Sequence, residues 1–100
     1  MIPSKKIEEL ISKHSLLEKD LSSGNVDKKM FAEKSKEYSD LNEIIEIAKK
    51  YISFDKDNKE LEKILEDKNS DNELKKMAEN ELNELKLEHN KNEKKLKLFL

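Results

Sequence analysis

Apolar residues recur along this chain at spacings of three and four, which is the pattern of helices that bury one face. The pattern first covers residues 4–21, where Ser4 is the expected N-cap and Gly24 is the left-handed residue that ends the helix. Asn25 or Asp27 then caps the helix that follows. The inward face of the first helix is expected to consist of Ile7, Leu10, Ile11, His14, Leu17 and Leu21.

The second predicted helix is long, because no Gly or Pro interrupts residues 26–67. It carries two inward-facing stripes, one in its first half and one running to its end. The first consists of Phe31, Tyr38, Leu41, Ile45, Ala48 and Ile52, and the second of Ile44, Ile47, Tyr51, Phe54, Asn58, Leu61 and Leu65. The two stripes coexist between residues 44 and 54, which predicts burial on two sides there. Residues 55–59 are almost wholly polar, and the pattern leaves open whether they form helix, kink or loop.

A third helix is predicted over residues 70–99. Ser70 and Glu73 form a Ser-x-x-Glu capping box directly before a periodic run, and residues 67–69 supply the turn. The seam of this helix consists of Leu74, Ala78, Leu82, Leu85, His89, Asn92, Leu96 and Phe99. The periodic pattern continues to the last residue without a terminal cap, so we expect a fragment of a longer protein.

The lengths of these helices predict an all-α fold in a single domain over residues 1–100. At a rise of about 1.5 Å per residue, the second helix extends roughly 60 Å, the third roughly 45 Å and the first about half as far as the second. Short turns make neighbouring helices antiparallel, so the first helix reaches only the first half of the second. We therefore expect an antiparallel three-helix bundle with a protruding two-helix coiled-coil arm. Because the first helix covers the face that a bare helix pair would offer to another copy, we expect a monomer.

The composition supports helices and narrows the classes of function. Charged residues make up 44% of the chain and apolar residues 34%, with one Gly, one Pro and no Cys, which disfavours β-sandwiches, disulfides and thiolate metal sites. The basic residues are all lysines and the net charge is −2, so direct sequence-specific nucleic-acid binding is not expected. No apolar run is long enough to span a membrane and no targeting signal opens the chain, so we expect a cytoplasmic protein.

No residue pattern is typical of an enzyme, and we expect no catalytic residue, cofactor or metal. His14 and His89 each precede a glutamate by four residues, but two ligands per site are too few for a metal centre. We interpret both as partly buried or surface imidazoles with Glu18 and Glu93 as neighbours. The single glycine excludes a Gly-rich phosphate loop. Four lysines are interpreted as cations near a helix C-terminus rather than as phosphate ligands, namely Lys91, Lys94, Lys95 and Lys97.

Several short motifs, in order along nearly the entire chain, resemble the amino-terminal domain of the bacterial class-I peptide chain release factor 1 family. The first helix opens on Ile7-Glu-Glu-Leu10, and the third contains Met77-Ala-Glu-Asn-Glu-Leu82, which resembles the family's Met-Ala-x-x-Glu-Leu core. Phe31-Ala-Glu-Lys-Ser-Lys-Glu-Tyr38 resembles the family's Phe-x-x-Leu-Ser-x-Glu-Tyr, with Lys34 departing at the leucine position. The family's Pro-x-Thr and Gly-Gly-Gln motifs do not occur, so no catalytic position is transferred.

The resemblance implies a peripheral domain of a translation termination factor, a protein that directs stop-codon-dependent peptidyl-tRNA hydrolysis. It also implies that the domain faces the ribosomal stalk base and a class-II GTPase release factor. The candidate interaction tip is the polar turn at the end of the arm, which contains Asp67, Lys68, Asn69, Asp71 and Glu73. The pattern leaves open a coiled-coil structural or adaptor protein with no ribosomal role, and charge makes a small nucleic-acid-binding helical module the less favoured third class.

Overall fold

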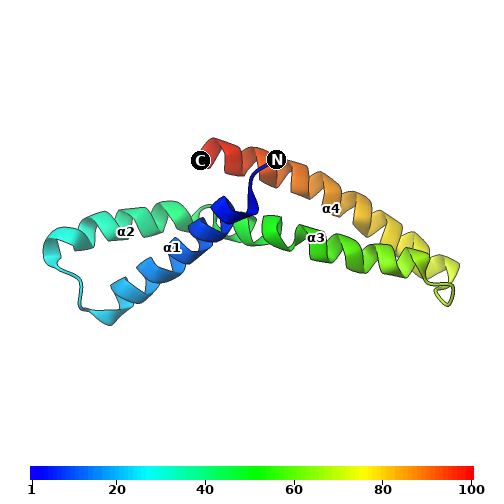
Figure 1. The fold of residues 1–100 in the computed structure, drawn as a ribbon, viewed down its shortest axis with the longest axis horizontal. Coiled ribbons are helices and arrows are strands. Elements are labelled where there is room, and N and C mark those ends of the chain that lie inside the picture. Colours follow the sequence, from blue (N-terminus) through cyan, green and yellow to red (C-terminus); the bar gives the residue numbers. More distant parts are fainter.

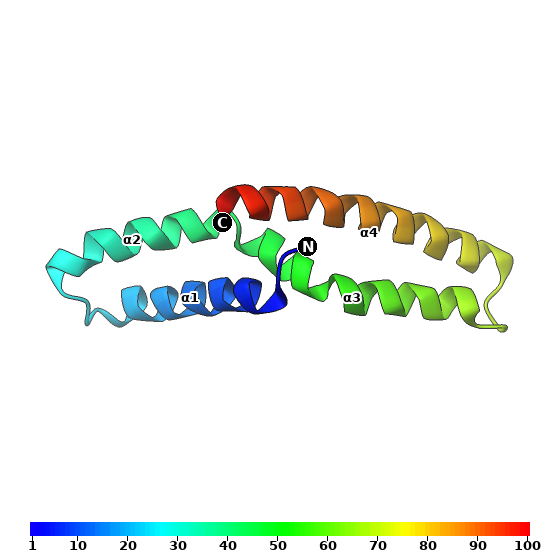
Figure 2. The same cartoon turned by 45° about the horizontal axis from the view of Figure 1, so that its top comes forward.

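Four α-helices and no strand make up the computed structural model, which describes residues 1–100. The helices are α1 (Ser4–Ser23), α2 (Lys28–Asn42), α3 (Ile45–Glu66) and α4 (Asn72–Phe99). Helices α1 and α2 form one antiparallel hairpin, and α3 and α4 form a second (Figure 1). The hairpins lie end to end in a body of 60 × 26 × 20 Å, with both chain ends near its middle (Figure 2). The all-α fold class is confirmed.

The single helix predicted over residues 26–67 is wrong, because the chain bends between α2 and α3. Ile44, with φ −114° and ψ −10°, lies at the break between the two helices. Its amide donates to the Leu41 carbonyl at 3.0 Å, and its own carbonyl accepts from the Ala48 amide at 2.9 Å. The two stripes that coexist in this stretch require partners in different directions, since α2 packs on α1 while α3 packs on both α1 and α4. The bend satisfies both and buries Leu41, Ile44 and Ile45 together.

The predicted bundle with an arm is accordingly replaced by two hairpins that share one core. This core lies where the hairpins meet and contains Ile2, Ile7, Leu10, Leu17, Leu41, Ile44, Ile45, Ala48, Tyr51 and Leu96. Leu96 is fully buried, so the last turns of α4 reach back over the junction. The seam predicted for α4 is buried at Ala78, Leu82, Asn92 and Leu96, whereas Leu74 and Phe99 at its ends are exposed.

The helix ends follow local chemistry, with two departures from the sequence prediction. Gly24 has φ 74°, the left-handed conformation expected of it, and Asp27 caps α2 by accepting from the Lys29 amide. Ser4 is the first residue of α1 rather than its cap. The Pro3 ring fixes the φ angle of Pro3, and the Pro3 carbonyl accepts a hydrogen bond from the Lys6 amide. Asp71 rather than Ser70 caps α4. A carboxylate is the stronger acceptor at the positive end of a helix.

Residues 55–59, which the pattern left open, lie within α3 as regular helix. They keep helical hydrogen bonding because local pairs support a polar stretch. The Ser53 hydroxyl donates to Asp57 Oδ2 at 3.2 Å, and the Asn58 amide donates to Glu62 Oε1 at 3.0 Å. Interactions between side chains four residues apart stabilise helices where packing does not. The α3–α4 hairpin is therefore continuous from the shared core to its turn.

Candidate interaction surface

Four of the five predicted tip residues lie on the turn that joins α3 and α4, and Glu73 lies in the first turn of α4, all at one extreme of the molecule (Figure 1). All five are exposed. Two of them hold the turn, since Asp67 Oδ1 accepts from the Asn69 amide at 2.9 Å and Asp71 Oδ1 accepts from the Leu74 amide at 2.7 Å. The side chains of Lys68 and Glu73 form no ion pair within the chain. The tip is thus a fixed turn that presents polar side chains to solvent.

The two histidines lie in separate hairpins. His14 is buried in the α1–α2 hairpin, where it stacks on Tyr38 at 4.8 Å and its Nε2 lies 2.5 Å from Asn42 Oδ1. His89 stacks on Tyr51 and Phe54 of α3, with ring centroids 4.6 and 3.8 Å apart. No group of three or more His, Asp or Glu residues is arranged to hold a metal ion. Both imidazoles therefore act as inter-helix packing groups.

The carboxylate neighbours predicted for the histidines do not pair with them. Glu93 Oε1 instead lies 3.1 Å from the Met1 amine and 3.2 Å from Lys97 Nζ. The amide of Ile2 donates to the Tyr51 hydroxyl at 3.2 Å, so the first residues lie along α3 and α4. Hydrogen bonds from the Met1 amine and from Lys97 lower the pKa of Glu93 below its ordinary value of 4.5. The ion pair and the amide hydrogen bond fasten the chain start to the second hairpin.

Replacing Glu93 by glutamine is expected to flatten the pH dependence of stability below neutral pH. Because the folded-state pKa of Glu93 is lowered, its contribution is present above the unfolded-state pKa and is lost as the pH falls through the folded value. Thermal unfolding followed between about pH 3 and about pH 7 measures this change. Glu79→Gln is the matched control, because Glu79 is an exposed glutamate of the same helix without an ion pair. A parallel pH profile for wild type and Glu93→Gln would contradict the prediction.

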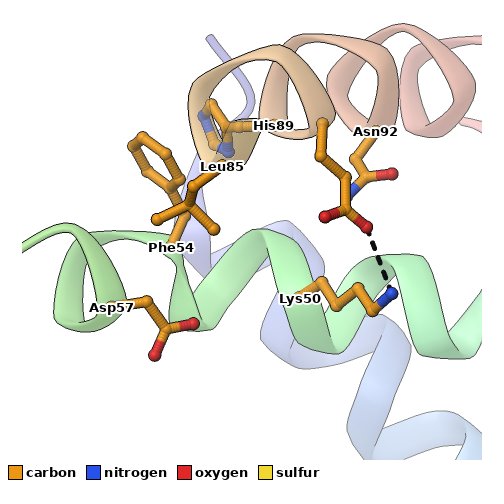
Figure 3. Close-up of a pocket in the computed structure, with 7 residues that line it drawn as sticks. Lys50, Phe54, Asp57, Leu85, His89 and Asn92 are labelled. Carbon is orange, nitrogen blue, oxygen red and sulfur yellow. Dashed lines mark hydrogen bonds and ion pairs between the residues drawn. The ribbon is translucent and has the colours of Figure 1, made fainter. Parts of the chain in front are cut away.

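A small cavity of about 150 Å³ lies between α3 and α4, nearer the shared core than the tip. Its lining consists of Lys50, Phe54, Asp57, Leu85, Glu88, His89 and Asn92 (Figure 3). Lys50 Nζ and Glu88 Oε1 form an ion pair of 3.1 Å across it. The sequence prediction did not single out this cavity as a site. Its one signal in the sequence is that His89 and Asn92 interrupt the apolar seam of α4.

None of the four helices is long and apolar enough to cross a membrane. A comparison with family models matches residues 10–100 to the PCRF domain. The chain belongs to the PCRF domain family. The match begins within α1 and includes all of α2, α3 and α4, so it contains both hairpins, the tip and the cavity.

Three curated relatives agree with this assignment. The chain is 71% identical over 100 residues to peptide chain release factor 1 of Pelagibacter ubique (strain HTCC1062), covering 100% of this chain and 28% of that protein. It is 40% identical over 77 residues to peptide chain release factor 1 of Wolbachia pipientis subsp. Culex pipiens (strain wPip), covering 76% of this chain and 21% of that protein. It is also 40% identical over 70 residues to peptide chain release factor 1 of Ehrlichia ruminantium (strain Gardel), covering 70% of this chain and 20% of that protein. The resemblance read from the sequence is confirmed.

The chain spans 28% of the length of the Pelagibacter relative and less of the other two. No solved structure matches it.

Proposed function

We propose that this PCRF domain is the amino-terminal helical module of a translation termination factor. The observation that carries the proposal is the 71% identity to a peptide chain release factor 1, which extends over all 100 residues. The family match over residues 10–100 supports it independently. Identity of 71% over all 100 residues exceeds what a shared lysine- and glutamate-rich composition produces. A coiled-coil adaptor with no ribosomal role is not favoured.

In this proposal the domain takes no chemical part in peptidyl-tRNA hydrolysis. Decoding and hydrolysis belong to parts of the factor outside these residues, since the Pro-x-Thr and Gly-Gly-Gln motifs are absent from the sequence. The buried imidazole of His14 supports this view, because it pairs with Asn42 and not with a nucleophile. The factor would act in the cytoplasm, and the domain would remain monomeric.

We further propose that the tip is the contact with the ribosomal stalk base and with a class-II GTPase release factor. Its position at the end of a 60 Å body gives it reach, and its exposed polar residues suit a small, reversible contact. Asp67 and Asp71 fix the turn, which leaves Lys68, Asn69 and Glu73 to meet a partner. Peripheral polar contacts of this kind contribute to the orientation and association rate of a complex, and they bury little surface area.

Deleting the domain from the parent factor is expected to weaken productive ribosome engagement while leaving the hydrolytic motifs intact. Peptide release from programmed ribosomes, with and without the GTPase factor, measures the effect. A finer variant replaces Lys68, Asn69 and Glu73 by alanine, and its matched control replaces Asn25, Lys28 and Glu33 at the opposite end. We expect only the tip variant to reproduce part of the loss of peptide release that the deletion causes. If the deletion changed neither ribosome association nor recycling, the domain would be a structural spacer.

A further inference from the structure

One face of α4 carries an exposed stripe that no helix of the chain covers. It consists of Leu74, Met77, Glu81, Glu84 and Glu88, which follow one another at steps of three and four residues. That spacing places them on a single face of the helix. All five are exposed, with Leu74 at 44% and Met77 at 56%. We refer to these five residues as the α4 stripe, which is apolar near the tip and acidic towards the shared core.

The acidic part of the α4 stripe destabilises its own helix. Glu81 and Glu84 are three residues apart and Glu84 and Glu88 four, so like charges are neighbours on the helix surface. No lysine forms an ion pair with Glu81 or Glu84, and only Glu88 has one, with Lys50. The surrounding part of the hairpin does not offset this negative charge, since residues 55–88 contain 12 acidic residues and seven lysines. Because these neighbouring like charges do not favour folding, their presence on one face indicates a partner that carries positive charge.

The cavity at the acidic end of the α4 stripe is a second, independent indication of a ligand. Asn92 lines it with only 6% of its surface exposed, and its side chain forms no hydrogen bond within the chain. Nδ1 of His89 is buried there without a partner as well. The lining also contains the carboxylates of Asp57 and Glu88 and the ring of Phe54. Figure 3 shows Phe54 and Asp57 on α3 and His89 on α4. Carboxylates, an amide oxygen and aromatic faces are the groups that hold a lysine ammonium or an arginine guanidinium.

We propose that the α4 stripe and its cavity form a docking surface for a basic amphipathic segment of a protein partner. Apolar side chains of that segment would lie on Leu74 and Met77, and its cations would face Glu81 and Glu84. One cation would enter the cavity and replace Lys50 as the partner of Glu88. Nucleic acid does not fit this surface, because its phosphates would meet the same carboxylates. Another copy of this chain would bring a like-charged stripe. The proposal does not depend on the role of the tip, which lies beyond Leu74.

The test uses the 100-residue chain and a synthetic helical peptide with arginine on one face and leucine on the other. Titration of the ¹⁵N-labelled chain is expected to shift the amides of the α4 stripe and of Asn92. Glu81→Lys with Glu84→Lys should raise the Kd at least about tenfold, since two attractions become repulsions. The control Glu33→Lys with Asp40→Lys adds the same charge to exposed positions of α2 and should change the Kd by less than about twofold.

Glu81→Gln with Glu84→Gln is the milder variant if charge reversal affects folding, and it should raise the Kd by a smaller factor in the same direction. Equal loss of affinity in the α4 and α2 charge variants would show unspecific attraction and overturn the proposal. Shifts confined to the tip or to the α1–α2 hairpin would also overturn it, as would tighter binding of a single-stranded RNA of equal length. A parent factor that failed to bind ribosomes would refute the proposed function and leave this peptide titration unaffected.

Discussion

Replacing Leu96 by alanine is expected to lower the free energy of unfolding by about 3–5 kcal/mol, a large part of the stability of a domain of this size. Leu96 is fully buried, and it packs into the core where the two hairpins meet. The other core residues come from the chain start, α1, α2, α3 and the α2–α3 bend, so Leu96 is the one contribution of α4 to this core. Its removal leaves a cavity and also loosens the second hairpin from the first.

Leu98→Ala is the matched control for this prediction, because Leu98 lies two residues further along the same helix and is 89% exposed. Its loss should change the free energy of unfolding by less than about 0.5 kcal/mol. Urea denaturation followed by circular dichroism measures both variants. Because Leu96 joins the two hairpins, Leu96→Ala is also expected to broaden the urea unfolding transition, since the hairpins would no longer unfold together. Similar losses for Leu96 and Leu98 would contradict the packing of α4 over the junction.

Leu41→Ala and Ile45→Ala are each expected to destabilise the chain by about 2–5 kcal/mol, and Leu65→Ala by less than half as much. Leu41 and Ile45 flank the bend and are 6% and 4% exposed. They belong to the shared core, which also contains residues of α1, α3 and α4, so truncation opens a cavity that no single helix can close. Leu65 lies near the tip, where only α3 and α4 meet, and it is half-buried.

The same denaturation experiment decides this comparison. The expected order follows from the number of helices around each side chain, since a residue between two helices near solvent loses less contact on truncation. Ile52→Ala provides a reference for α3, because Ile52 lies in the same helix with 37% of its surface exposed. Equal losses at Leu41, Ile45 and Leu65 would mean that the stability of the chain is spread evenly along its length instead of being concentrated at the bend.

Sequence reasoning succeeded where neighbouring residues alone determine the structure. The left-handed Gly24 was predicted, and the cap of α2 was narrowed to Asn25 or Asp27, of which the structure uses Asp27, because each depends on contacts within a few residues. The cap of α4 was predicted one residue early, since Ser70 and Asp71 both carry acceptors and the sequence alone does not rank them. The five tip residues were found together because they lie within seven consecutive residues of the chain.

The bend at Ile44 was missed for a different reason. It contains no Gly or Pro, and the sequence placed its main risk of a break at the polar residues 55–59 rather than at Ile44. The overlap of the two stripes was recognised as burial on two sides, but a straight helix was assumed to accommodate it. The structure shows that α2 packs on α1 whereas α3 packs on both α1 and α4, so the backbone changes direction between them. The cavity escaped prediction for the same reason, because its residues come from two helices that only the fold brings together.

The sequence by itself determined the helical class, the left-handed end of α1 at Gly24 and the polar tip, because helix periodicity, helix-end signals and turn residues act over four residues or fewer. It also established the family resemblance. Tertiary structure alone decided the bend at Ile44, the end-to-end arrangement of the hairpins, the inter-helix stacking of His14 and His89, and the cavity beside the α4 stripe. These features depend on which apolar stripe finds which partner. That choice minimises exposed apolar surface over the entire chain, and no local segment contains the information for it.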